Sequence, residues 1–170
     1  MTAVDAGGQL RPVGDGSELK RAYSCFPTGV VAVCCEIDGQ PVGLAASSFA
    51  TVSLDPPLVS FCVDNGSTTW PRLRGAPALG VSVFASGQGA HCRQLAGPAE
   101  RRFEGLSMQS GPEGALLLPG ATAAMACTIA DEIAAGDHTL IMLRILHLHA
   151  DPSMEPLVFH ASTCRALENR

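Results

Sequence analysis

Charged side chains are scarce in this sequence. Its 170 residues include 16 Asp and Glu and 11 Lys and Arg, so charged residues make up 16% and the net charge is −5. Soluble domains typically contain about 25% charged residues. So few cations leave no basic surface for nucleic acid, and we expect no nucleic-acid partner. A low net charge together with 46% hydrophobic residues also excludes a disordered chain.

Long hydrophobic runs and export signals are absent as well. The longest apolar run, residues 139–148, contains Arg144 and His147 and is much shorter than the roughly 18 residues of a membrane helix. The first 30 residues hold no apolar segment typical of a signal peptide. We therefore expect a cytoplasmic protein with no membrane association. Its length predicts a single domain over residues 17–170, preceded by a flexible tail at residues 1–16.

Paired cysteines and standard catalytic motifs are missing too. The seven cysteines form no C-x-x-C pair, and their odd number favours free thiols that pack as small hydrophobic side chains. Cys34 and Cys35 are adjacent in a β-rich segment, so they should point to opposite faces of a strand. Walker, G-x-G-x-x-G and G-x-S-x-G motifs are absent. His147 and His149 have no recognisable third ligand, so we expect no metal.

The sequence does contain a succession of short apolar segments separated by turn signals. Asp38-Gly39 is a strong hairpin signal, and strands outnumber helices, so an antiparallel barrel is favoured over a parallel sheet. Several strands are apolar on both faces, which is a first indication of a partner subunit. The expected strands cover residues 30–37, 41–46, 47–52, 58–63, 79–84, 123–133, 139–149 and 156–159. The expected helices cover residues 17–24, a short segment capped by Thr68 or Thr69, and residues 89–95.

Small polar residues cluster in three places beside these strands, at residues 27–30, 45–49 and 65–69. Hydroxyl groups and exposed backbone amides of this kind suit a neutral heteroaromatic ring or a phosphate. Ordinary turns and strand ends have the same composition, so the residues alone leave both interpretations open.

The clusters, taken in order, resemble the short-chain NAD(P)H:flavin oxidoreductase family. These enzymes are the flavin reductase components of two-component flavin-dependent monooxygenases and halogenases. The resemblance extends over residues 19–167, and the stretch from Ala46 to Leu58 together with Gly-Asp-His is its most specific part. The matching motifs are Phe26-Pro-Thr-Gly-Val30, Gly43-Leu-Ala-Ala-Ser-Ser-Phe49, Val52-Ser-Leu-Asp-Pro-Pro-Leu58, Asn65-Gly-Ser-Thr68, Arg102-Phe-Glu-Gly105 and Gly136-Asp-His138.

The resemblance implies a mainly β fold, a split β-barrel of Greek-key type with a few short helices, assembled as a homodimer. It implies that FAD or FMN binds at the subunit boundary, accepts a hydride from NADH or NADPH, and leaves reduced for a partner oxygenase. The cofactors then carry the chemistry, and the protein orients them. Because aromatic residues make up only 5% of the chain, small residues and backbone amides must hold the flavin ring.

Motif positions also imply roles for individual residues. His138 is the candidate catalytic residue, near the nicotinamide or the flavin edge, although a turn-capping role stays open. Arg102 and Phe103 border the pocket or are purely structural. The remaining cofactor-binding candidates are Thr28 and Gly29 near the ring or ribityl chain, Ala46, Ser47, Ser48 and Phe49 along the ring, Ser53 with Asp55 and Pro56 shaping the site, Ser67 and Thr68 at the phosphate, and His160.

Two positions depart from the family pattern. Cys164 stands where an aromatic residue is common, which leaves open how the dinucleotide is held on that side. Trp70 either packs in the interior or forms a wall of the phosphate pocket. Two alternative functions remain: a pyridoxamine-phosphate-oxidase-like protein with tightly bound FMN, and a flavin-binding module without catalysis. FAD against FMN and NADH against NADPH also remain open.

Overall fold

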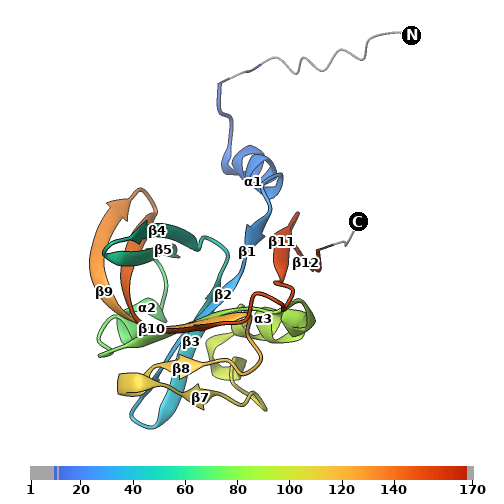
Figure 1. Ribbon diagram of the computed structural model, residues 1–170. Coiled ribbons are helices and arrows are strands. Elements are labelled where there is room, and N and C mark those ends of the chain that lie inside the picture. The colour runs from blue at the N-terminus through green and yellow to red at the C-terminus, as the bar shows by residue number, and fades with distance from the viewer. Residues whose placement is uncertain (1–9, 11, 168–170) are drawn as a thin grey trace.

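The computed structural model describes residue 10 and residues 12–167, and Figure 1 labels most of its helices and strands. The expected tail at residues 1–16 lies largely outside this part of the chain. The helices are α1 (Gly16–Ser24), α2 (Trp70–Leu73), α3 (Gly89–Leu95), η1 (Ser86–Gln88), η2 (Ala99–Arg101) and η3 (Pro112–Gly114). The strands are β1 (Thr28–Gly29), β2 (Val31–Ile37), β3 (Gln40–Ala46), β4 (Ala50–Leu54), β5 (Pro57–Asp64), β6 (Leu79–Val83), β7 (Gln109–Ser110), β8 (Leu116–Leu117), β9 (Ala123–Ala135), β10 (His138–Ala150), β11 (Val158–His160) and β12 (Thr163–Arg165).

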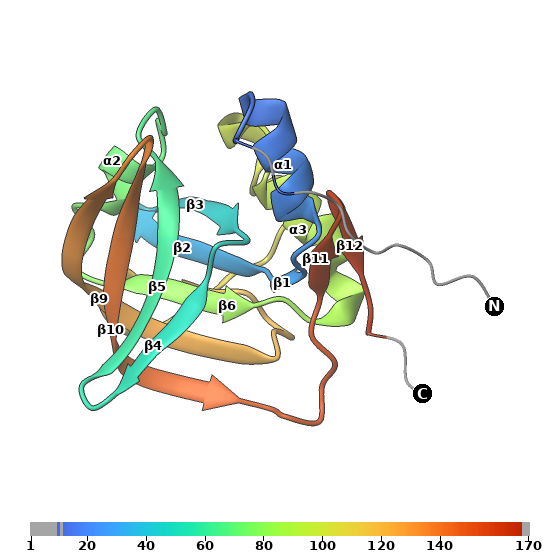
Figure 2. The same ribbon diagram turned by 90° about the horizontal axis from the view of Figure 1, so that it is seen from above.

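A seven-stranded antiparallel sheet forms the body of the molecule, in the order β3-β2-β6-β9-β10-β5-β4. The sheet curls into an incomplete barrel, as Figure 2 shows, and its two edge strands do not pair with each other. This is the expected mainly β, split-barrel architecture. A small sheet of β1, β11 and β12 lies beside α1 at one end of the barrel (Figures 1 and 2).

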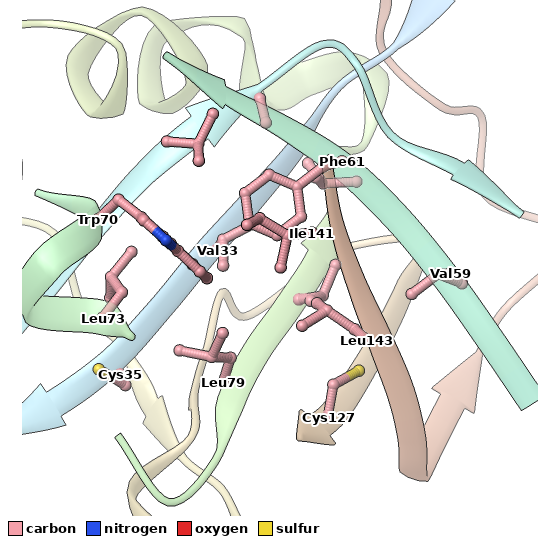
Figure 3. Close-up of a cluster of buried hydrophobic side chains, with 14 of the residues drawn as sticks. Val33, Cys35, Val59, Phe61, Trp70, Leu73, Leu79, Cys127, Ile141 and Leu143 are labelled. Carbon is pink, nitrogen blue, oxygen red and sulfur yellow. The ribbon is translucent and has the colours of Figure 1, made fainter. Parts of the chain in front are cut away.

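Two hydrophobic clusters lie on the two faces of β2. The barrel interior contains Cys35, Phe61 and Trp70 (Figure 3). The rings of Phe61 and Trp70 pack edge to face, with their centroids 5.6 Å apart. The second cluster contains Cys34, Leu95 and Leu157 and lies between the sheet and α3. The two adjacent cysteines therefore point to opposite faces, as predicted. All seven cysteines are free.

The turns and helices expected from the sequence were mostly confirmed where particular residue types favour one backbone conformation. Asp38 and Gly39 both adopt positive φ in the hairpin turn, and α3 has the expected bounds. The structure differs from the expectations in two ways. Residues 47–49, expected to begin a strand, leave the extended pattern before β4, and the short strands β1, β7, β8 and β12 were not expected. Of these short strands, β7 and β8 pair locally with each other and β12 pairs locally with β11, and none of the four is long enough to show a strand pattern in the sequence.

Candidate functional site

Two neighbouring hollows contain most of the predicted site residues. The His138 cleft, of about 380 Å³, is lined by residues of β3, β5 and α3 together with His138 and Arg102. The His160 pocket, of about 600 Å³, is lined by α1, Thr28 and the β11–β12 turn. Ser47 and Ser48 line both hollows. Both volumes fall in the range of ligand-binding clefts, about 300–1,000 Å³.

His138 stands at the start of β10 and is partly exposed to the His138 cleft, with 42% of its side chain accessible. Its Nδ1 lies 2.8 Å from the carboxylate oxygen of Asp137. This hydrogen bond is the main reason why the pKa of Asp137 lies below its ordinary value. An ionised carboxylate only accepts, so Nδ1 carries the proton and Nε2 remains for a ligand in the cleft.

Asn65 holds the turn that presents this histidine. Its side-chain amide donates to the carbonyl of Gly136 at 3.1 Å and its oxygen accepts from the hydroxyl of Thr139 at 2.9 Å. Its backbone N–H donates to the carbonyl of Asp137. Asn65 belongs to one of the matching motifs but had no role assigned to it. The signal that could have found it is its position directly before Gly66, because Asn beside Gly is typical of a turn held by side-chain hydrogen bonds.

Ser48 and Ser47 play different parts although they are adjacent. The Ser48 hydroxyl accepts from the backbone N–H of Cys62 at 2.8 Å and donates to its carbonyl at 3.2 Å. It therefore replaces a strand pairing between the end of β3 and β5, and it has no proton left to donate to a ligand. The half-buried Ser47 hydroxyl makes no hydrogen bond within the described residues, so Ser47 is the member of the pair that can bind one.

Arg102 connects three segments around the His138 cleft. Its guanidinium donates to the carbonyls of Gly43 and Gly97 and to the hydroxyl of Thr69, each at 2.8–2.9 Å. Partial burial lowers its pKa from the ordinary value without removing its charge. Arg102 therefore fixes the cleft wall and also places a positive charge beside it.

The loop before α2 contributes Ser67 to the His138 cleft, whereas Thr68 is exposed outside it. Thr69, one of the two expected residues, occupies the cap position of α2, but its side chain makes no capping hydrogen bond. The hydroxyl that accepts from the backbone N–H of Trp70 belongs to Ser67. The Thr69 hydroxyl is already the acceptor for Arg102. Trp70 is buried in the barrel interior, which identifies it as a packing residue.

The His160 pocket combines aromatic surface with the only lysine of the chain, Lys20. Tyr23 and Phe26, both largely exposed, and Phe159 supply the aromatic surface. Thr28 Oγ1 is buried and has no hydrogen-bond partner among the described residues. A ligand in the pocket would supply that partner. Sequence reasoning missed Lys20 and Tyr23, because a short polar helix before a motif carries no signal of a site.

The remaining candidates lie outside both hollows. Phe49 packs against the barrel interior and Phe103 packs against the second cluster. Gly29 pairs with Val158 in the small sheet. Ser53 lies on β4, and Asp55 and Pro56 form the turn between β4 and β5. Within one chain, the structure therefore places none of these six residues in either hollow. The same is true of Thr68.

The site suits a flat, polar ring better than covalent or metal chemistry. Small residues, Ala45, Ala46 and Ser47, line the His138 cleft, and a flat ring can lie against them. No group of three or more metal-ligating side chains occurs within residues 10 and 12–167. Nor does any helix of the described chain have the length and apolarity needed to cross a membrane.

Comparisons with known proteins agree with this geometry. The family described as "Flavin reductase like domain" matches residues 23–168. A flavin reductase of Pseudomonas putida is 34% identical over 161 residues, covering 94% of each chain. The reductase subunit of a flavin-dependent monooxygenase from Rhodococcus jostii is 32% identical and covers 91% of this chain and 79% of its own. The solved NADH:FAD oxidoreductase of Streptomyces globisporus, in complex with NAD and FAD fragments, superposes with a TM-score of 0.87 at 32% identity, covering 95% of this chain and 98% of that one.

Proposed function

This chain belongs to the flavin reductase like domain family, and from that premise we propose that it reduces free FAD or FMN with NADH and releases reduced flavin to a partner oxygenase. The Rhodococcus relative is named as the reductase subunit of a flavin-dependent monooxygenase. The Streptomyces relative is named as an NADH:FAD oxidoreductase. Both names support a transfer of electrons from the dinucleotide to flavin as the activity of this chain.

One observation carries the proposal: Ser47 and Ser48 form a wall common to the His138 cleft and the His160 pocket. Two ligands bound in these hollows would meet at this wall. Hydride transfer between two cofactors requires such a contact and needs no nucleophile from the protein.

We assign the flavin to the His138 cleft and the dinucleotide to the His160 pocket. Bound flavin would supply the hydride acceptor. Ala46 and Ser47 would lie along its ring, Ser67 would donate to its polar chain, and Arg102 would provide a positive charge near its phosphate. Thr28, His160 and Lys20 would hold the dinucleotide.

His138 is proposed as the residue that orients the dinucleotide at the flavin edge. Asp137 holds its Nδ1 proton, so Nε2 faces the ligands as an acceptor, or as a donor when the ring is protonated. The residue would position the nicotinamide and stabilise charge, and hydride transfer would continue more slowly without it.

We further propose that the functional unit is a homodimer in the cytoplasm, with residues 17–170 as one domain. Exposed leucines on the two strands that flank β5 support a dimer: Leu54 on β4 is 98% exposed and Leu148 on β10 is 69% exposed. Exposed apolar surface on a sheet is typical of a protein interface. A second subunit could also bring Ser53, Asp55 and Pro56 close to the flavin.

A steady-state assay that crosses FAD and FMN with NADH and NADPH tests the proposal. We expect oxidation of NADH only when flavin is added, with saturation by FAD or FMN. The two alternative functions predict other results. A protein with tightly bound FMN would be isolated yellow, and a binding module would take up flavin but leave NADH unoxidised in every combination.

A further inference from the structure

The sulfur atoms of Cys92 and Cys164 face each other at a distance of 3.9 Å. Cys92 is buried on α3, and Cys164 is partly exposed on β12. These residues are 72 positions apart in the chain, so only the fold brings them together. No function described above uses either thiol.

The pair joins elements that line both hollows. Cys164 pairs with Phe159 in the β11–β12 hairpin, and Phe159 lines the His160 pocket. Cys92 lies one helical turn before Leu95 and Ala96, which line the His138 cleft. A link between the two sulfurs would therefore tie the wall of the pocket to the wall of the cleft.

We propose that Cys92 and Cys164 are a redox-modification site: peroxide converts them to a reversible disulfide that fastens the β11–β12 hairpin to α3. A disulfide needs a sulfur separation near 2.05 Å. The hairpin must therefore move toward α3 by up to about 2 Å, which is feasible for two three-residue strands.

The reaction balances with hydrogen peroxide as the oxidant. Peroxide oxidises the Cys164 thiolate to a sulfenic acid and is reduced to water. The Cys92 sulfur then attacks the sulfenic sulfur, the disulfide bond forms, and a second water leaves with the remaining proton. In sum, two thiols and one peroxide give one disulfide and two waters.

The order of the two steps follows from the surroundings of the sulfurs. Burial raises the pKa of Cys92 to about 12, so this residue stays a thiol until its neighbour is oxidised. Cys164 is the more accessible sulfur and is therefore the one that meets peroxide first.

A source of peroxide follows from the proposed function, on which this part of the inference rests. Reduced flavin and dioxygen form hydrogen peroxide in solution when no oxygenase consumes the flavin. The disulfide would then restrain the hairpin beside the dinucleotide and raise the KM for NADH. The thiol pair would thus slow the enzyme when its product is in excess.

The test treats the full chain with hydrogen peroxide and measures intact mass under non-reducing conditions. We expect a loss of about 2 Da, a peptide that links the segments containing Cys92 and Cys164, and reversal by dithiothreitol. We also expect the melting temperature to rise by about 5–10 °C, because the bond closes a long loop. Mass gain at Cys164 by sulfinic acid without a linked peptide would overturn the proposal.

Matched variants separate the possible outcomes. Cys164→Ser should abolish the linked peptide and the shift in melting temperature, whereas Cys25→Ser, which removes an exposed cysteine, should keep both. The mass measurement does not depend on flavin or NADH, so its failure is distinct from failure of the proposed function. An unchanged KM for NADH in a disulfide-linked enzyme that is active would overturn the regulatory role.

Discussion

His138 is the proposed catalytic residue of the site, and the position of its ring proton depends on the preceding residue, Asp137. The Asp137 carboxylate fixes the proton on Nδ1, and Asn65 fixes the turn. The pKa of Asp137 lies below its ordinary value of 3.8. A lowered carboxyl pKa means that this pairing favours the folded state at neutral pH. This contribution of the Asp137 carboxylate to the free energy of unfolding is lost only as the pH falls through its folded-state pKa, below about 3.8.

Replacing this side chain tests its role directly. His138→Ala should lower kcat/KM for NADH by about tenfold, mainly through a higher KM, because a positioning contact is lost and hydride transfer remains. Steady-state kinetics with saturating flavin measure the change. The control His147→Ala removes an exposed histidine of β10 and should leave both constants unchanged. Equal kinetics for the His138 variant and the unmodified enzyme would contradict the assignment.

Ser162 is a second residue with a measurable effect, since it adopts a φ of 60° in the β11–β12 turn. Non-glycine residues in this left-handed region are destabilised by about 1–2 kcal/mol. Ser162→Gly should therefore raise the free energy of unfolding by about 1 kcal/mol, measured by urea denaturation. Ser110→Gly, at an exposed strand position, should not stabilise the protein. A destabilised Ser162 variant would show that the turn is unstrained.

The residue scale is also where sequence reasoning had its clearest limit. The motif predicted that Ser47 and Ser48 share one role, because adjacent serines look alike in a sequence. The fold separates them: Cys62 on β5 takes both hydrogen bonds of the Ser48 hydroxyl. Such a division depends on a strand 14 positions away, so no local pattern contains it.

At the scale of elements, α1 is the part of the site that packs least against the barrel. None of its residues is buried, and its N-terminus is held by Asp15, whose carboxylate accepts from the hydroxyl and backbone N–H of Ser17 and from the N–H of Glu18. These hydrogen bonds lower the pKa of Asp15, so the cap is complete at neutral pH and weakens as the pH falls below about 3.8.

Removing the cap should loosen α1 without unfolding the barrel. Asp15→Ala should increase the rate of tryptic cleavage after Lys20 and Arg21 by about threefold or more, because the helix opens more often. Mass spectrometry of the released peptides measures this rate. Asp15→Asn keeps a good capping oxygen and should be cleaved at nearly the original rate. Identical rates for the Ala variant and the unmodified protein would mean that the cap does not hold the helix.

The elements that the sequence predicted are those with strong local signals. The β-rich run at residues 30–37 and the Asp38-Gly39 turn signal predicted β2 and β3, and the helices expected at residues 17–24 and 89–95 are α1 and α3. β12 was missed because Thr163–Arg165 has three residues and no apolar alternation, and it is a strand only through its pairing with β11. The sequence named Thr28 and His160 as site residues, but it did not show that α1 completes the His160 pocket, which forms where α1 and this hairpin come together.

At the scale of the whole molecule, the scarcity of charge goes together with apolar surface that one chain leaves exposed, and we propose that a second subunit covers it. Val52 and Leu54 on β4 and Leu146 and Leu148 on β10 are exposed on strands that flank β5. A second subunit that covers these strands would remove this surface from water.

A charge introduced on that surface should break the proposed dimer. Light scattering during gel filtration should give a mass of about 35 kDa for the unmodified protein, twice 17.6 kDa. Leu54→Asp should shift the mass toward that of one chain, because a dimer would bury two unpaired carboxylates. Leu10→Asp changes an equally exposed leucine outside the sheet and should leave the mass unchanged. A monomeric unmodified protein at micromolar concentration would contradict the dimer.

The central claim is that flavin is reduced and released rather than kept. The most direct measurement follows NADH oxidation by protein freed of small molecules, with and without added FAD, together with the visible spectrum of the protein. The account predicts a colourless protein that oxidises NADH only when FAD is present, at a rate that saturates with FAD. A yellow protein with one flavin per chain that leaves NADH unoxidised would contradict it.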